Sequence, residues 1–314
     1  MPEDRSGGGQ WDWARALGLL GAAGTFSVLN PGVLVAVPFV LLVLFLPARR
    51  LRTLVVGALA VILTFGGAAG SGLWYLERGW GLLLGGWFIT LTLRWPGIRF
   101  LPRGLGAVGG TFAVMALLFW VQPGHWAVVD WAVRSRMERG MSAALEAFRY
   151  LRPEGLSETF EARAAEAMVL QGTIFPALLG LASLAALGLA WWLWNRLSLG
   201  EEGDRLGPLR EFRFNDQLVW ILILGLGVLL LGSGLLGRLG TNTVVFMGAL
   251  FALRGVAVVL FLSGGVSFLG IVLFLVGLLF LAPLLVTGAF VIGLGDAWLN
   301  LRARKEQLDS AGGP

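Results

Sequence analysis

The chain has 314 residues, of which 57% are hydrophobic and only 14% charged, and its formal net charge is +5. Soluble domains carry about 25% charged residues, and a charge at mid-bilayer costs about 3 kcal/mol or more, so the composition indicates an integral membrane protein. The lack of cysteine excludes disulfides, thiolate nucleophiles and cysteine-ligated metals, and a single histidine, His125, excludes a histidine-rich metal site. We therefore expect no metal and no cofactor. The arginines indicate membrane topology rather than nucleic-acid binding.

Apolar segments follow one another at lengths close to the roughly 20 residues that cross about 30 Å of hydrocarbon as a helix. They predict an all-α, polytopic transmembrane helix bundle of about eight to ten spans. The spans are expected near 16–29, 32–46, 53–70, 79–95, 104–122, 173–195, 217–237, 242–262 and 266–295. The first segment is interpreted as a membrane helix rather than a signal peptide, because few basic residues precede it and no clear cleavage site follows.

Short arginine-rich loops predict which side of the membrane each segment faces. The loops 49–52 and 94–103 are expected on the cytoplasmic side by the positive-inside rule, and 196–213 is compatible with that side too. Counted onward, a single ninth span would leave the basic tail 302–305 outside, against the same rule. Either Pro283 divides 266–299 into two segments, or 16–46 does not cross twice, and the sequence leaves both open.

A long polar stretch divides the chain in two. The predicted domains are a polar tail (1–15), an N-terminal membrane bundle of about five spans (16–122), an extracytoplasmic amphipathic helical linker (123–172), a C-terminal membrane bundle (173–301) and a second polar tail (302–314). Within the linker, Val133, Met137 and Met141 recur at helical spacing, which predicts a helix that lies at the membrane interface or caps the bundle. Pro153 and Gly155 are expected to end it.

Three polar residues in the C-terminal half are candidates for substrate binding. Arg254 lies near the middle of an apolar segment, where an arginine must face protein or a water-filled cavity. It either binds an anionic substrate group or pairs with Asp296, which itself either binds a ligand amine or marks the end of a span. Asn242 either caps a helix or lines a pocket. The pair Glu77-Arg78 is interpreted as a solvated turn, since exposed charges in a short loop need no further explanation.

The second half also carries a series of short motifs. They are Phe175-Pro176-Ala177-Leu178-Leu179, Phe212-Arg213-Phe214-Asn215-Asp216, Leu253-Arg254-Gly255-Val256-Ala257 and Gly293-Leu294-Gly295-Asp296-Ala297-Trp298, followed by Arg302. The pattern resembles the uncharacterised YybS-like family of bacterial inner-membrane proteins over about 174–303, and over the first half only in hydropathy. Members of that family often carry Gln-Gly where this chain has Arg254-Gly255, so Arg254 departs from the family pattern.

The resemblance implies a location in the bacterial inner membrane. It also implies a fold similar to the substrate-binding membrane subunits of energy-coupling-factor vitamin transporters and to the rod-shape membrane protein MreD, although fold does not give function. The expected partners are the lipid bilayer and either separate ATPase and coupling subunits or envelope proteins, with no nucleic acid.

Two functions of different classes remain open. The first is a non-enzymatic, solute-binding component of transport, which needs a separate ATPase because the chain has no Gly-Lys-Ser/Thr phosphate loop. The second is a structural or assembly protein of the cell envelope. An intramembrane enzyme is disfavoured, because the spans offer few acids, bases or nucleophiles beyond Arg254 and Asp296. A pocket between helices around those two residues would favour the first function, and an exposed apolar face on 133–151 the second.

Overall fold

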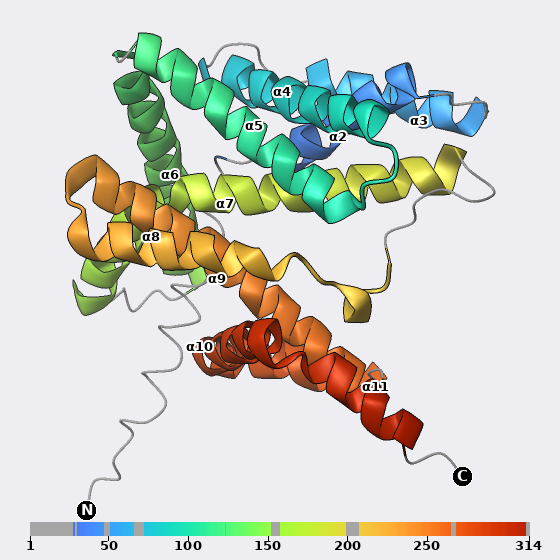
Figure 1. Cartoon of the computed structure of the whole chain (residues 1–314). Coiled ribbons are helices and arrows are strands. Elements are labelled where there is room, and N and C mark those ends of the chain that lie inside the picture. The colour runs from blue at the N-terminus through green and yellow to red at the C-terminus, as the bar shows by residue number, and fades with distance from the viewer. Residues whose placement is uncertain are drawn as a thin grey trace, which may run out of the picture. The chain divides into compact units, whose positions relative to one another are not determined.

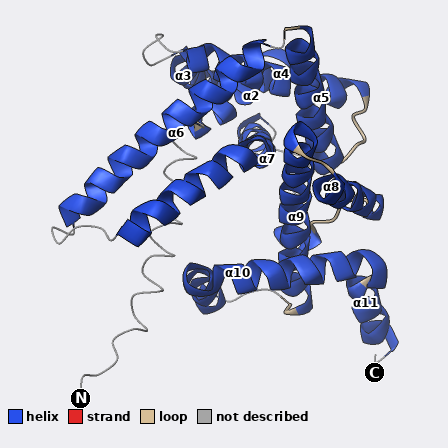
Figure 2. Ribbon diagram, turned by 90° about the vertical axis from the view of Figure 1, so that its left-hand side faces the viewer, coloured by secondary structure: helices blue, strands red, loops and turns tan. Residues whose placement is uncertain are grey.

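The computed structural model describes Val28 and residues 30–46, 51–65, 72–122, 124–151, 158–198, 207–264 and 268–311. Over these residues the chain consists of helices and connecting loops, without a strand (Figure 2). The prediction of an all-α fold is confirmed. Contacts divide the chain into two compact units, one of Leu19–Leu206 and one that comprises Met1–Gly18 and Gly207–Pro314. Most of the first predicted span, 16–29, lies outside the described residues.

The Leu19–Leu206 unit is assembled around a short apolar helix. Its helices are α2 (Pro31–Phe45), α3 (Leu51–Phe65), α4 (Gly72–Arg94), α5 (Phe100–Val121), α6 (Gly124–Leu151) and α7 (Glu158–Ser198). Helix α2 begins where the Asn30 side chain accepts a hydrogen bond from the Val33 backbone N–H, with Pro31 in the first turn. It packs against α3, α4 and α7 and buries Phe39 and Leu42 almost completely. Gly85 lets α4 approach closely, because a Cβ there would lie 3.1 Å from the Pro38 Cα.

Helix α6 is the amphipathic helix that the sequence predicts. Its apolar stripe faces inward: Val133 and Met137 form a buried cluster with Val28 and Leu73, and Met141 is only 1% exposed. This stripe therefore packs against the unit and caps it, instead of offering the exposed apolar face that would favour a scaffold role. Pro153 and Gly155, which are expected to end the helix, lie outside the described residues.

Helix α7 is long and continuous. It runs for 41 residues from Glu158 to Ser198 and passes without a break through 172–173, where the sequence places the end of the linker. It includes Pro176, which a long helix tolerates in a membrane when neighbours satisfy the freed backbone groups. The predicted domain boundaries stay a prediction, and the contacts place the division between the units at 206–207.

The Gly207–Pro314 part of the other unit begins with an irregular segment, residues 207–218, which we call the lead-in segment. This part of the unit ends in a short helix. Its elements are η1 (Leu209–Glu211), η2 (Asp216–Leu218), α8 (Val219–Leu231), α9 (Gly234–Leu262), α10 (Phe268–Leu299) and α11 (Leu301–Ala311). Helices α8 and α9 lie side by side (Figure 1). The turn between them falls at 232–233, where Gly232 is extended and Gly234 has a φ of +57°. The prediction that a new segment begins near Asn242 is wrong, because the glycines end α8 earlier and α9 starts at Gly234.

Helix α10 is interrupted near its middle. Leu281 has non-helical backbone angles (φ −123°, ψ 24°), two residues before Pro283. Proline lacks the backbone N–H, clashes with the preceding turn and disfavours helical angles in the residue before it. The kink at Leu281 agrees with the expectation that Pro283 divides 266–299 into two segments.

Several of the described helices have the length and composition of membrane spans. Three are long and apolar enough to cross a bilayer, namely Phe100–Val121, Ala165–Ser198 and Gly234–Leu262. Shorter apolar helices lie at Pro31–Phe45, Arg52–Phe65, Asp216–Leu231 and Pro283–Leu299. The chain is a membrane protein with several candidate spans, whereas the exact count of eight to ten stays a prediction.

Candidate functional site: a buried arginine–aspartate network

Arg254 is fully buried in α9, with a relative exposure of 0%. Its Nε donates to Asp296 Oδ2 at 2.9 Å, and its Nη1 donates to Asp216 Oδ1 at 2.6 Å. These carboxylates come from the end of α10 and the start of η2, 42 and 38 positions away along the chain. Of the two alternatives that the sequence left open for Arg254, the pairing with Asp296 is present in the structure, and substrate binding stays a prediction. We call Arg213, Asp216, Arg254, Asp296 and Arg302 the Arg254 network.

Two glycines bring Arg254 and Asp296 together. A Cβ on Gly255 would overlap the Ala289 carbonyl oxygen, and a Cβ on Gly293 would overlap the Phe251 carbonyl oxygen. The backbones of α9 and α10 therefore touch at this crossing, which is possible only where both residues lack a side chain. The crossing brings Arg254, the residue directly before Gly255 on α9, within ion-pair distance of Asp296, three residues beyond Gly293 on α10.

Arg302 joins the network from the start of α11. Asn300, with a φ of +46°, turns the chain between α10 and α11. The Arg302 Nη2 donates to Asp296 Oδ2 at 2.9 Å, and its Nη1 donates to the carbonyl oxygens of Phe212 at 3.1 Å and Arg210 at 3.4 Å. Asp296 thus accepts from two arginines while Arg302 also holds the lead-in segment. Residue 302 and the 210–212 loop consequently lie at the same end of the unit.

Asp216 is the exposed edge of the network. Its side chain is 42% exposed, whereas that of Asp296 is 2% exposed. The Asn215 side chain caps η2 by accepting from the Gln217 backbone N–H at 3.0 Å, and this holds Asp216 in the first position of the element. Arg213 lies outside it, with Nη2 3.9 Å from Asp216 Oδ2 and 2.5 Å from Asn300 Oδ1. The Asp216 carboxylate is therefore the accessible one of the two that bind Arg254.

Aromatic rings shield one side of the Arg254 guanidinium from water. The Arg254 guanidinium carbon lies 5.3 Å from the centre of the Phe214 ring, close enough for a cation–π attraction. Phe214 in turn packs edge-on against Phe251, with ring centres 5.1 Å apart. Both rings are buried, so they keep water from that side of the guanidinium and strengthen its electrostatic interactions.

One donor of the buried guanidinium is unused. Arg254 Nη2 is buried without a hydrogen-bond partner, and so is Arg302 Nε. Neither Asp216 nor Asp296 makes the two-pronged contact that an arginine fork allows, because each binds Arg254 through one oxygen. Three arginines also meet only two carboxylates here. The site has the chemistry to bind one further oxyanion.

The structure brings together two of the three predicted site residues. Asn242 is not among them: it lies 12 positions before Arg254 in α9, about 18 Å along the axis at 1.5 Å per residue. It is also not a helix cap, because it stands inside α9 and its Nδ2 donates to the Arg238 carbonyl oxygen at 2.8 Å. Sequence reasoning missed Asp216 and Arg302 as members of the site. The signal was present, since both stand at span ends within or beside the motifs quoted above.

A second expectation about charge is wrong. Arg78 is buried inside α4 rather than in a solvated turn, and it donates to the Thr64 carbonyl oxygen at 2.6 Å and the Trp74 carbonyl oxygen at 3.0 Å. Glu77 lies 3.7 Å from Arg78 and 3.4 Å from Arg136 of α6. The helix begins at Gly72, so the two charges that were expected in a loop stand in its second turn.

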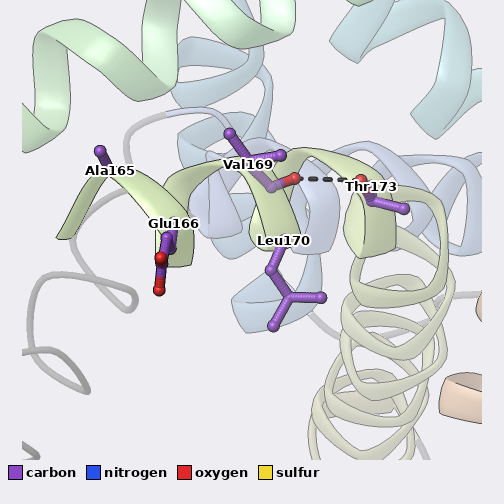
Figure 3. Close-up of a pocket in the computed structure, with 5 residues that line it drawn as sticks. All are labelled: Ala165, Glu166, Val169, Leu170 and Thr173. Carbon is purple, nitrogen blue, oxygen red and sulfur yellow. Dashed lines mark hydrogen bonds between the residues drawn. The ribbon is translucent and has the colours of Figure 1, made fainter. Parts of the chain in front are cut away.

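The surface also has one hollow on α7. Ala165, Glu166, Val169, Leu170 and Thr173 line it, and all five belong to that one helix (Figure 3). Thr173 Oγ1 donates to the Val169 carbonyl oxygen at 3.0 Å, so its hydroxyl is used within the helix. A hollow along one helix lacks the convergent polar groups that fix a ligand, and we do not assign it a binding role.

The apolar helices and the buried ion pairs between them define this chain as an integral membrane protein. It belongs to the family described as predicted membrane protein (DUF2232), whose model matches residues 16–297. That match includes the N-terminal half, where the sequence resemblance rested on hydropathy alone. No curated protein and no solved structure matches the chain. The finer likeness to vitamin-transporter subunits and to MreD stays a prediction.

Proposed function

We propose that the protein is a non-enzymatic membrane component that binds a solute for transport and relies on a separate ATPase, in the inner membrane of a bacterium. The observation that supports this most directly is Arg254, a fully buried arginine in a membrane helix with an unused Nη2 donor. An ionisable residue within a membrane helix is by default a pointer to a functional site. The network around it has more positive than negative groups, so the solute carries an anionic group.

The exposed members of the network are Asp216 and Arg213, whose side chains are 42% and 45% exposed. A solute can therefore approach Arg254 without crossing hydrocarbon, from the end of the unit where the lead-in segment and the start of α11 meet. Phe214 and Phe251 pack beside the guanidinium, which suits a ligand with an apolar part next to its anionic group. Asp296 stays on the far side of the guanidinium and holds it in place.

The alternative is a structural or assembly protein of the cell envelope. The observation that favours it is on α6, where Trp131 is 70% exposed and Val128 61% exposed, away from the buried stripe of Val133, Met137 and Met141. Aromatic residues of this kind anchor protein contacts, and they also suit a membrane interface. Such a role requires no ligand at Arg254.

The two functions are separated by affinity purification from native membranes, followed by analysis of bound proteins and small molecules. We compare the wild type with Arg254→Gln and with Arg134→Gln, an equal charge loss on α6, where the Arg134 side chain is 66% exposed. A metabolite that is retained by the wild type and by Arg134→Gln but lost from Arg254→Gln supports transport, as does co-purification of an ATPase. Envelope proteins without any enriched metabolite would overturn it and favour the scaffold.

A further inference from the structure

We propose that Asp216 competes with the ligand for Arg254. Its carboxylate binds Arg254 until an external carboxylate or phosphate group displaces it. This inference rests on the proposed solute-binding function and names the ligand's chemistry and the event that accompanies binding. The contact to be exchanged is the one between Arg254 Nη1 and Asp216 Oδ1, at 2.6 Å.

The two carboxylates of the network are unequal, and only one is free to leave. Asp296 is 2% exposed and accepts from both Arg254 and Arg302, so removing it would leave two buried arginines without their shared counter-charge. Asp216 is 42% exposed and has a single buried arginine partner, because its other neighbour, Arg213, is itself 45% exposed. When Asp216 leaves Arg254, its carboxylate passes into water near Arg213, at a small cost in solvation.

An incoming oxyanion makes a better contact than Asp216 does. Asp216 uses Nη1 alone, and the neighbouring Nη2 is buried without a partner. A carboxylate or phosphate that approaches the same end of the guanidinium can bind Nη1 and Nη2 together, in the two-pronged geometry that arginine offers and lysine does not. It removes an unsatisfied buried donor that the Asp216 contact leaves behind. The exchange therefore favours an external group with two coplanar oxygens.

Displacement also loosens the lead-in segment. Asp216 is the first residue of η2, directly before α8, and Arg254 is the buried group that holds it. Binding of an oxyanion replaces that tie, while Arg302 keeps its hydrogen bonds to the carbonyl oxygens of Arg210 and Phe212. Ligand occupancy at Arg254 is thus coupled to the position of 214–218, the kind of differential contact that a ligand-driven change requires.

The test uses inorganic phosphate and acetate as probes on the full-length protein in detergent. Thermal unfolding is followed at rising concentrations of each probe, with chloride at equal ionic strength as the reference. If Asp216 competes for Arg254 in most molecules, Asp216→Asn lowers the half-saturating probe concentration by about tenfold, because the competent fraction rises toward one. Asp130→Asn, a carboxylate on α6, serves as the control and leaves the wild-type value unchanged.

A second variant distinguishes loss of the oxyanion site from misfolding of the protein. Arg254→Lys in the Asp216→Asn background keeps the buried positive charge but lacks the fork, and it is expected to lose the response to both probes. A response that is equal in the wild type and Asp216→Asn, or that survives in the lysine variant, overturns the proposal. Replacing phosphate by phosphatidylglycerol in the micelles separates two sources of the same chemistry: a response to lipid alone assigns the oxyanion to a headgroup, and a response to phosphate assigns it to a solute.

Failure of this inference and failure of the transport role give different results. A tenfold gain in Asp216→Asn, with no metabolite recovered from native membranes, keeps the oxyanion site and overturns transport. A metabolite that depends on Arg254 but is bound equally well by the wild type and Asp216→Asn keeps transport and overturns displacement by Asp216.

Discussion

The two units each bury an arginine, but they satisfy it by different chemistry. In the Leu19–Leu206 unit, Arg78 donates to the backbone carbonyl oxygens of Thr64 and Trp74 and lies 3.8 Å from the centre of the Trp74 ring. In the other unit, Arg254 donates to two carboxylates from distant segments. A backbone carbonyl cannot leave its place without unfolding a helix, whereas a carboxylate on an exposed edge can. Arg78 also has the Glu77 carboxylate 3.7 Å away, but that side chain is only 14% exposed, whereas the Asp216 side chain beside Arg254 is 42% exposed and is the one that a ligand can replace.

The largest loss of stability is expected from removing Asp296, the carboxylate that two arginines share. Asp296→Ala leaves Arg254 and Arg302 buried without their common partner, and breaking a buried pair in this way costs about 3–5 kcal/mol. Glu77→Ala, the matched change in the Leu19–Leu206 unit, is expected to cost less, because Arg78 keeps both of its carbonyl acceptors. Melting temperatures from tryptophan fluorescence in detergent, at a fixed scan rate, compare the two variants. An equal loss in both would show that the carboxylates play the same role.

The next largest effect concerns the crossing of α9 and α10. Gly255→Ala places a methyl group against the Ala289 carbonyl oxygen and pushes the helices apart, for which overpacking costs of about 1–3 kcal/mol are usual. The separation also weakens the ion pair between Arg254 and Asp296. Gly248→Ala, on the same helix with nothing within 4 Å of the added carbon, is the control and should leave the melting temperature nearly unchanged. If both variants melt alike, close approach of the backbones is not what positions Arg254.

Replacing Arg78 sharpens the contrast between the two buried arginines. Arg78→Gln removes hydrogen bonds from a charged donor to two carbonyl oxygens, which costs about 1.5–3 kcal/mol for each such bond at most. We expect a lower melting temperature together with an unchanged half-saturating phosphate concentration. Arg254→Lys should do the reverse and lose the phosphate response with a smaller fall in melting temperature. A phosphate response that depends on Arg78 would contradict the assignment of the site to Arg254.

How much of the fold can be predicted from the sequence depends on how far apart the interacting residues lie along the chain. Apolar length and helical spacing predict α2 to α5, α8 and the inward stripe of α6, because those signals repeat every few residues. The start of α9 was missed, since it depends on the φ of Gly234 rather than on hydropathy. The placement of Glu77 and Arg78 was wrong because an arginine can be buried when nearby carbonyl oxygens accept its hydrogen bonds.

The site could be predicted only in part. Arg254 is conspicuous because it interrupts an apolar segment, and Asp296 is the nearest acid in the next one. Asp216 and Arg302 stand in polar stretches where charges are ordinary, so composition does not distinguish them from the solvated residues around them. Their role arises from two backbone features, the α9–α10 crossing at Gly255 and Gly293 and the turn at Asn300. Neither feature has a periodic signal.

The remaining prediction concerns topology, where the Arg254 network supports one of the alternatives left open by the sequence, the division of 266–299 at Pro283. Arg302 donates to the carbonyl oxygens of Arg210 and Phe212, so the start of the C-terminal tail and the 207–218 segment lie at the same end of their unit. An interrupted α10 allows this, because a kink at Leu281 lets the chain return to the side from which it came. The basic residues 302–305 then share a side with Arg210 and Arg213 of the same unit, and the positive-inside rule places such basic residues on the cytoplasmic side.

Single cysteines test this directly, because the chain contains none of its own. Glu211→Cys and Arg304→Cys, both at exposed positions, are expected to react with a membrane-impermeant maleimide from the same side of sealed vesicles. Ser233→Cys, at the exposed turn between α8 and α9, should react from the opposite side, since α8 separates it from the lead-in segment. Stability should hardly change, because none of the three side chains is buried. Labelling of residues 211 and 304 from opposite sides would contradict the contacts of Arg302 and, with them, the proposed route of a solute to Arg254.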